Sequence, residues 1–172
     1  MTLEHIHQLI RDVPDFPKPG IVFKDITPIL ERGEAFGALT RHMAERVPAH
    51  VNKIVAIESR GFILGSAVAQ YLRCGLVIVR KPGKLPRATL RETYELEYGS
   101  DALEVHEDAL RRGDRVVVID DVLATGGTAA AAERLCDRIG AQVLTSIFLM
   151  EIEVLRGRDK LKNPSTSLIV VR

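Results

Sequence analysis

One segment of this chain constrains its fold more than any other. An apolar run at 116–119, the adjacent acids Asp120 and Asp121, a small glycine-containing turn and an alanine-rich stretch follow one another without interruption. The apolar run predicts a buried strand, and the stretch 128–139 predicts the helix that follows it. A strand that passes through a glycine turn into a helix is the unit of parallel α/β sheets.

The rest of the chain repeats this alternation. Further buried strands rich in Val and Ile, and the helices between them, are expected at 53–57, 62–71, 76–79, 142–150 and 167–171. Such strands, separated by helices, predict a single α/β domain over residues 1–172 with a parallel, twisted sheet covered on both faces. Ligands of such sheets bind at the carboxyl ends of the strands.

Less regular segments surround this alternation. Pro14, Pro17 and Pro19 predict an extended stretch, because proline lacks a backbone donor and restricts the residue before it. The remaining expected elements are a helix at 3–12, a short strand at 21–26, a helix at 34–47 and a short helix at 151–158.

The turn after Asp121 has the composition of a phosphate cradle. Thr125, Gly126, Gly127 and Thr128 can place backbone N–H groups and hydroxyls around an anion at a helix N-terminus. Two carboxylates suit ribose hydroxyls or a hydrated metal better than the phosphate itself. The segment therefore indicates a ligand with a phosphate and a sugar; the alternative is an ordinary strand–turn–helix corner with solvated acids.

A second polar turn follows the strand at 53–57. Ser59 and Arg60 precede the helix at 62–71, and arginine is suited to bidentate contacts with phosphate. The alternative is a Ser N-cap beside a solvent-facing Arg. With both turns on strands of one sheet, a sugar that carries a phosphate at one end and a pyrophosphate at the other fits the layout.

An insertion at 81–108 separates two strands of the sheet. Its first part is basic and contains Pro and Gly, which predicts a bent, mobile loop; its second part is acidic and predicts a hairpin or β-ribbon. Cations on such a loop can close over a leaving pyrophosphate. The alternative is a solvated loop with offsetting charges. Glu95 and Glu97 are expected on one face of the ribbon, where a surface role is the default.

Phe23 is conspicuous in a chain with 5% aromatic residues, since it lies beside charged residues after the proline-rich approach. An aromatic side chain in that setting can stack a nucleobase. The alternative is a core phenylalanine.

These segments together resemble one family. PDFPKPGIVFKDITP, ESRGF, VRKPGKLP, YELEYG and VVVIDDVLATGGT, in this order, are similar to the motifs of the adenine phosphoribosyltransferases, a branch of the type I phosphoribosyltransferases. The resemblance covers about residues 12–161. It implies the type I phosphoribosyltransferase fold, with an N-terminal hood at about 1–33, a core at about 34–172 and a flexible loop at 81–93.

The resemblance also implies a reaction. Adenine and 5-phosphoribosyl-1-pyrophosphate (PRPP) would give AMP and pyrophosphate in purine salvage, with Mg²⁺ held mainly by substrate and water rather than by protein ligands. A homodimer is implied as well. A related enzyme for another purine base, or a non-catalytic regulator that senses PRPP, are the competing interpretations.

Roles for individual residues follow from the same resemblance. Ala124, Thr125, Gly126, Gly127 and Thr128 would bind the 5′-phosphate, and Asp120 and Asp121 the ribose hydroxyls. The pyrophosphate would face Ser59, Arg60, Arg80, Lys81 and Lys84. Adenine would lie between Phe23 and Ile152, read by backbone groups of Val22 and Lys24, with Glu97 as the acid/base carboxylate. The family also places a cis peptide near Glu58–Ser59. Glu58 and Lys24 stand where some relatives have Asp and Arg, and both changes preserve charge.

The composition of the chain argues against several other classes of function. A net charge of +1 gives no general case for nucleic-acid binding, and no apolar run or N-terminal pattern indicates a membrane span or signal peptide. We therefore expect a cytoplasmic protein. The five histidines lack metal-ligand spacing, and Cys74 and Cys136 are predicted to be buried free thiols.

Overall fold

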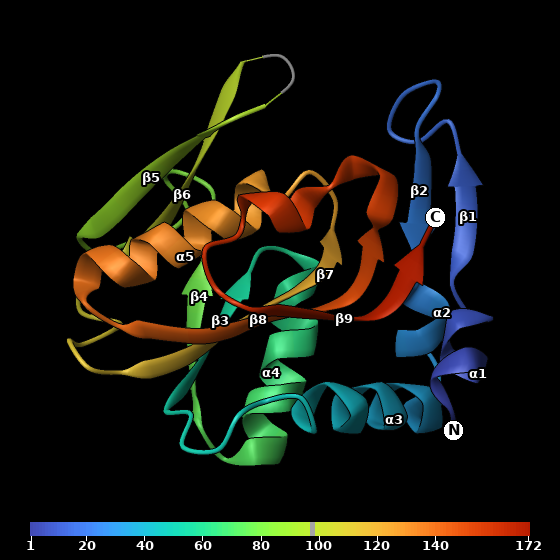
Figure 1. Cartoon of the computed structure of the whole chain (residues 1–172), viewed down its shortest axis with the longest axis horizontal. Helices are drawn as coiled ribbons and strands as arrows, with labels where there is room; N and C mark the ends of the chain where they lie inside the picture. The colour runs from blue at the N-terminus through green and yellow to red at the C-terminus, as the bar shows by residue number, and fades with distance from the viewer. Residues whose placement is uncertain (97–98) are drawn as a thin grey trace. The chain divides into compact units, whose positions relative to one another are not determined.

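The computed structural model describes residues 1–96 and 99–172, and its chain divides into two compact units, Met1–His42 and Met43–Arg172. The second unit is built on a five-stranded parallel sheet with the strand order β4-β3-β7-β8-β9 (Figure 1). Its strands are β3 (Lys53–Ile57), β4 (Gly75–Val79), β7 (Arg115–Leu123), β8 (Gln142–Ile152) and β9 (Ser165–Val171). The predicted α/β class and parallel sheet are confirmed.

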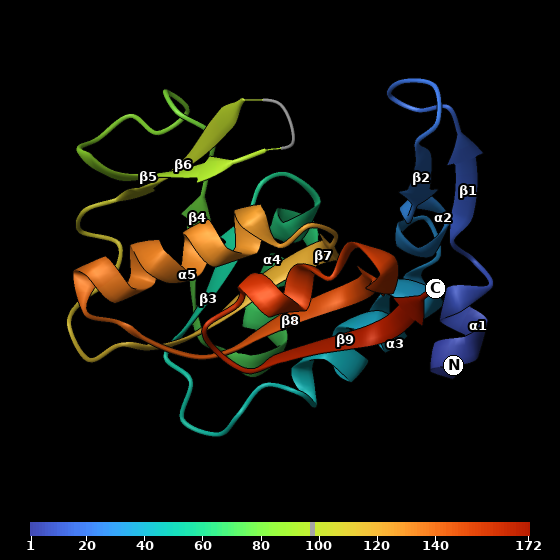
Figure 2. The same ribbon diagram turned by 45° about the horizontal axis from the view of Figure 1, so that its top comes forward.

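Two helices, α4 (Arg60–Leu72) and α5 (Gly127–Ile139), cover opposite faces of this sheet (Figure 2). Alternate residues of β3 show the division, because successive strand side chains point to opposite faces. Val55 and Ile57 pack in the cluster that contains Leu135 of α5. Ala56 faces α4 so closely that a Cβ added at Gly65 would lie 2.6 Å from the Cβ of Ala56. A glycine is therefore required where α4 crosses β3.

The insertion forms the expected antiparallel ribbon, β5 (Thr89–Glu95) and β6 (Ser100–His106). Tyr94, Leu103 and Val105 belong to the same buried cluster as the α5 face of the sheet. The basic segment before the ribbon is tied to it by two backbone hydrogen bonds between Arg80 and Glu104, of 2.9 and 2.7 Å. The ribbon is thus anchored to the core at its base.

The first unit contains α1 (Leu3–His7), β1 (Arg11–Pro14), β2 (Val22–Asp25), α2 (Thr27–Leu30) and most of α3 (Gly33–Ala44). The predicted helix at 3–12 is wrong beyond His7. Residues 11–14 form a strand instead, paired antiparallel with β2. Pro14 favours extended backbone at the residue before it, and the β2 partner lies too far along the chain for a local pattern to indicate it.

The expected helix at 151–158 is also wrong. β8 runs on to Ile152, because Glu151 still has ladder partners in β7 and β9 and Ile152 pairs with Val171. Two short 3₁₀ turns follow, η1 (Glu153–Leu155) and η2 (Gly157–Lys160), separated by Arg156 in the left-handed region at φ +51°.

Both cysteines are free, as expected; Cys136 is buried in α5, whereas Cys74 is only partly buried after the end of α4. No helix in the part of the chain that the structure describes is long and apolar enough to cross a membrane.

Candidate active site

The carboxyl ends of the parallel strands bring the predicted polar turns of the second unit to one edge of the sheet. β3 leads into Ser59 and Arg60, β4 leads into residues 80–84, and β7 leads into residues 124–128, called loop 124–128 below. Since neighbouring strands in the order β4-β3-β7-β8 run in the same direction, these turns emerge side by side.

Loop 124–128 encloses a small pocket at the N-terminus of α5. The pocket has a volume of about 80 Å³ and is lined by Asp120, Val122, Leu123, Ala124, Thr125, Gly126, Thr128 and Ala129. Gly126 is the N-cap residue of α5 at φ +78°, a conformation that glycine adopts without a Cβ penalty. The first backbone N–H groups of a helix have no intrahelical partners, so this pocket suits an anion.

Gly157 supports this loop from behind, and the sequence reasoning missed it. A Cβ added at Gly126 would lie 2.1 Å from the Gly157 carbonyl oxygen, and a Cβ added at Gly157 would lie 2.1 Å from the Ala124 carbonyl oxygen. Only two glycines allow the backbones to approach this closely. The glycine between two basic residues in LRGRDKL was the available signal, but its partner loop is distant in sequence.

The two adjacent acids have different environments. The strand was expected to end at residue 119, which would have placed both acids after it. β7 extends to Leu123, so both acids lie inside the strand. Asp120 lines the pocket, whereas the buried Asp121 accepts a hydrogen bond from Nε of Arg60. Burial and the nearby Asp121 carboxylate raise the pKa of Asp120 well above its usual range. The ionised form of Asp120 is therefore disfavoured.

Arg60, predicted to face pyrophosphate, is thus paired with one of the predicted ribose ligands. The Glu58–Ser59 peptide bond is cis, as the resemblance implied. Ser59 occupies the N-cap position of α4, but its side chain makes no capping hydrogen bond in the described structure. The simple N-cap interpretation of Ser59 therefore does not account for its presence.

Lys81 is held by the ribbon. Its ammonium donates to the Tyr94 hydroxyl at 2.8 Å and to the Asp101 carboxylate. Burial alone would lower the pKa of Lys81, but the hydrogen bonds that its ammonium donates to Asp101 and Tyr94 outweigh burial and raise this pKa. Tyr94 also accepts a hydrogen bond from the Thr128 hydroxyl at 3.2 Å. Tyr94 and Asp101, absent from the predicted site, thereby link a pyrophosphate candidate to the start of α5.

The two other predicted cations of this region differ in exposure. The Arg80 guanidinium lies 3.6 Å from the Glu58 carboxylate and 5.8 Å from the centre of the Phe62 ring. Lys84 is exposed, and its backbone N–H donates to the Lys81 carbonyl at 3.3 Å.

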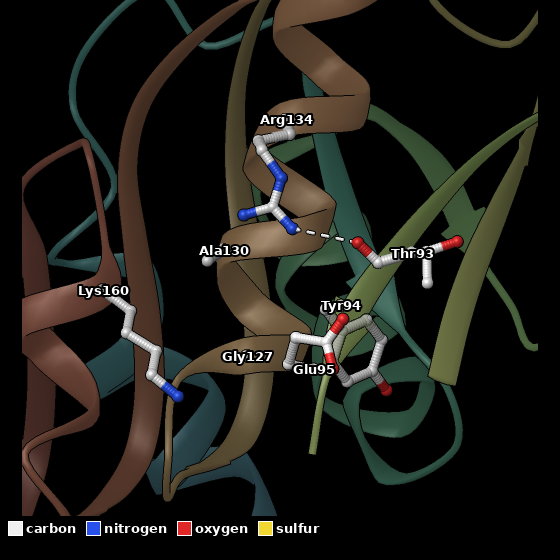
Figure 3. A pocket seen from close by; sticks show the side chains of 7 residues that line it. All are labelled: Thr93, Tyr94, Glu95, Gly127, Ala130, Arg134 and Lys160. Atoms are coloured by element: carbon white, nitrogen blue, oxygen red, sulfur yellow. Dashed lines mark hydrogen bonds between the residues drawn. The ribbon is translucent and has the colours of Figure 1, made fainter. Parts of the chain in front are cut away.

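A larger pocket of about 380 Å³ lies between the ribbon, α5 and η2 (Figure 3). Its lining residues are Thr93, Tyr94, Glu95, Gly127, Ala130, Arg134 and Lys160. Arg134 donates to the Thr93 carbonyl at 3.4 Å and to Glu92 at 2.7 Å. Glu97, the predicted acid/base residue, lies outside the described residues.

The residues predicted to hold adenine come from both units. Val22, Phe23 and Lys24 lie in β2 of the first unit, where the Phe23 ring meets Phe16 edge to face at 5.2 Å and Lys24 pairs with Asp12 at 2.7 Å. Phe23 is partly exposed, unlike the core phenylalanine of the alternative interpretation. Ile152 ends β8 of the second unit.

The described residues contain no group of three or more His, Cys, Asp or Glu side chains arranged to hold a metal ion. The Asp120–Asp121 pair is the donor set that fits a hydrated Mg²⁺, because its carboxylate oxygens suit a hard cation that retains most of its water.

Comparisons with known proteins agree on one family. Residues 26–171 match the phosphoribosyl transferase domain. The chain is 51% identical over 160 residues to an adenine phosphoribosyltransferase of Syntrophotalea carbinolica. The aligned region covers 92% of this chain and 94% of that protein. The crystal structure of the Thermoanaerobacter pseudethanolicus adenine phosphoribosyltransferase superposes with a TM-score of 0.96, at 49% identity over 99% of this chain and 100% of that one.

The Giardia lamblia enzyme, solved in complex with 9-deazaadenine, gives a TM-score of 0.93 at 40% identity, over 100% of this chain and 99% of its own. Likeness of this degree over nearly the whole chain, together with the matched domain, means that the chain belongs to the adenine phosphoribosyltransferase family.

Proposed function

We propose that this chain transfers the 5-phosphoribosyl group of PRPP to adenine, giving AMP and pyrophosphate, with loop 124–128 as the 5′-phosphate site. The observation that carries the proposal is the small pocket at the N-terminus of α5, lined by that loop and by Asp120. An anion there meets the free N–H groups of the helix, and the neighbouring carboxylate is placed for a sugar hydroxyl.

The pyrophosphate group of PRPP is assigned to the turns that follow β3 and β4. Ser59, Arg60, Arg80, Lys81 and Lys84 form the proposed pyrophosphate site. Arg60 and Lys81 each form an ion pair with a carboxylate, the first with Asp121 and the second with Asp101. Pyrophosphate would compete with these carboxylates for the two cations. We infer that binding of PRPP exchanges protein ion pairs for contacts to phosphate oxygens.

Mg²⁺ is proposed to bind PRPP mainly through the substrate and water, with Asp120 and Asp121 accepting hydrogen bonds from ribose hydroxyls or from water on the ion. When bound, the ion would neutralise charge on the departing pyrophosphate. Ionised Asp120, which burial and Asp121 disfavour, would gain a further partner at that point.

Charge development at C1′ sets the remaining requirements. As pyrophosphate leaves, C1′ gains positive charge, and water must be excluded or hydrolysis competes with transfer. Closure of the segment 81–93 would exclude water and bring its cations to the leaving group. Glu97 is proposed to exchange a proton with a ring nitrogen of adenine. Phe23 and Ile152, with backbone groups of Val22 and Lys24, remain the predicted adenine contacts.

The identity of the base is the sharpest test. Pyrophosphate release should be measured with PRPP and adenine, hypoxanthine or guanine in turn, and we expect rapid release only with adenine. Equal rates with hypoxanthine would favour the enzyme for another purine. Saturable nucleic-acid binding without formation of AMP would favour a PRPP-sensing regulator. A homodimer and a cytoplasmic location remain part of the proposal, and sedimentation would test the first.

A further inference from the structure

Loop 124–128 rests on a segment whose position is set by side chains outside the site. The backbone of Gly157 packs closely against Ala124 and Gly126, so the position of the loop depends on the position of Gly157. The residue that follows, Arg158, is the centre of a hydrogen-bond network that fixes η2 against the sheet.

Arg158 uses its whole guanidinium for this purpose. It donates from Nε and Nη2 to the two carboxylate oxygens of Glu151, and from Nη1 to the backbone carbonyl and hydroxyl of Ser165, at 2.5 and 2.8 Å. The Ser167 hydroxyl donates to Glu151 at 3.0 Å. A planar, five-donor side chain satisfies this set as lysine does not.

Glu151 connects the network to the loop from the other side. It is buried in β8, and its ladder partner in β7 is Leu123, the residue before the loop. The hydrogen bond from Arg158 is the main cause that lowers the pKa of Glu151, which keeps the carboxylate ionised and paired. One ion pair therefore joins the strand that delivers the loop to the turn that supports it.

The far end of η2 is also fixed. Leu161 packs against Leu123, Ala129 and Phe148. The buried Glu133 of α5 accepts hydrogen bonds from the backbone N–H groups of Lys162 and Asn163, at 3.1 and 3.2 Å. Both ends of η2 are therefore fixed by contacts, and these contacts set the position of Gly157 against the loop.

We propose that Arg158, acting through Glu151 and Gly157, is a positioning residue for the 5′-phosphate of PRPP and AMP. The inference rests on the proposed 5′-phosphate role of loop 124–128. Arg158 itself is not placed in contact with substrate; it holds the N–H groups of the loop where the phosphate oxygens bind. Loss of this support should therefore weaken phosphate binding specifically, and leave recognition of the base unaffected.

The test compares ligands that differ only in the phosphate. Calorimetry with AMP and with adenosine, and steady-state kinetics with PRPP and adenine, would be run on Arg158→Ala, Arg158→Lys and Asp159→Asn. We expect Arg158→Ala to raise the Kd of AMP and the KM of PRPP by about tenfold to about a hundredfold, the range of small misplacements. The Kd of adenosine and the KM of adenine should stay unchanged, and Arg158→Lys should be intermediate.

Asp159→Asn is the matched control. Asp159 lies in η2 beside Arg158 and pairs at the surface with Arg156, whose side chain is 80% exposed. Its substitution should change none of the four constants. Should Arg158→Ala fail to fold, Ser167→Ala removes a hydroxyl bonded to both members of the ion pair and should raise the Kd of AMP by a smaller factor.

A separate variant distinguishes failure of this inference from failure of the proposed site. Thr125→Ala removes an exposed hydroxyl of the loop itself and should weaken AMP by about tenfold, as loss of a hydrogen bond to a charged group does. If Thr125→Ala weakens AMP but folded Arg158→Ala and Arg158→Lys do not, the positioning role of Arg158 is overturned. If Thr125→Ala leaves AMP binding unchanged, the 5′-phosphate assignment is overturned instead.

Discussion

The ionised carboxylate of Asp120 lowers the stability of the folded chain. Burial and the adjacent Asp121 raise the pKa of its carboxyl group, so its ionised form at neutral pH disfavours the folded state. We expect Asp120→Asn to stabilise the ligand-free protein by about 1 kcal/mol, which corresponds to a rise in Tm of about 2–4 °C, while PRPP binding weakens. Thermal unfolding at pH 7 and a PRPP titration would measure both effects.

Asp121→Asn is the control with the opposite sign. Asp121 is the buried partner of Arg60, and its substitution removes the ion pair between these two side chains. We expect Asp121→Asn to lower the Tm. A lower Tm for Asp120→Asn as well would contradict the view that Asp120 is kept for the ligand rather than for the fold.

Glu97 offers a second residue-scale prediction. We expect Glu97→Gln to lower kcat by about 10²- to 10⁴-fold, the usual contribution of a general acid or base, with little change in PRPP affinity. Glu95→Gln is the matched control, since Glu95 is two residues earlier on the same predicted face and is exposed. Full turnover in Glu97→Ala would remove the acid/base role.

At the scale of elements, the turn from β7 into α5 makes a distinct prediction. Gly126→Ala combines a positive φ with a Cβ 2.1 Å from the Gly157 carbonyl oxygen, so the loop must move. We expect loss of about 2 kcal/mol or more in stability and a large rise in the KM of PRPP. Chemical denaturation and steady-state kinetics would measure these effects.

Gly113→Ala is the control for backbone conformation alone. Gly113 also has a positive φ, at +87°, but a Cβ there would meet nothing within 4 Å. Its substitution should lower stability by about 1 kcal/mol and leave the KM of PRPP unchanged. An equal change in KM for both variants would show that contact with Gly157 is irrelevant to the loop.

Local patterns located most elements but not all of their ends. The strand at 53–57 and the helix after Gly126 match their expected positions because their periodicity and flanking residues are local. The end of β8 and the strand at 11–14 were missed, because each is set by pairing with residues distant in sequence. The same limit applies to the site: both acids were found, but the pairing of Asp121 with a residue 61 positions earlier could not be.

At the scale of the whole molecule, the parallel sheet explains why sequence motifs predict so many residues of the candidate site. Every polar turn that follows a parallel strand emerges at one edge, so the ESRGF, RKPGK and ATGGT segments had to be neighbours. Supports that lie outside those turns, such as Gly157 and Arg158, carry no ligand chemistry of their own. Their role follows only from packing, which no local pattern contains.

The carboxylates of the second unit also set its response to acid. Hydrogen bonds from Arg158 and Lys81 lower the pKa values of Glu151 and Asp101, respectively. Burial would raise the pKa of Asp114, but Lys53 outweighs it and lowers this pKa as well. A lowered pKa in the folded state gives stability that is present above the ordinary carboxyl pKa and is lost as pH falls through the folded value.

We therefore expect these three carboxylates to contribute constant stability from about pH 7 to about pH 5, and to lower the Tm below about pH 4. Asp120 acts in the opposite direction, since its raised pKa means that protonation relieves an unfavourable charge as pH falls. Asp120→Asn lacks this gain, so its Tm should exceed that of the parent by less at about pH 5 than at about pH 7. If the difference in Tm between the two proteins were the same at every pH, the assignment of a raised pKa to Asp120 would be contradicted.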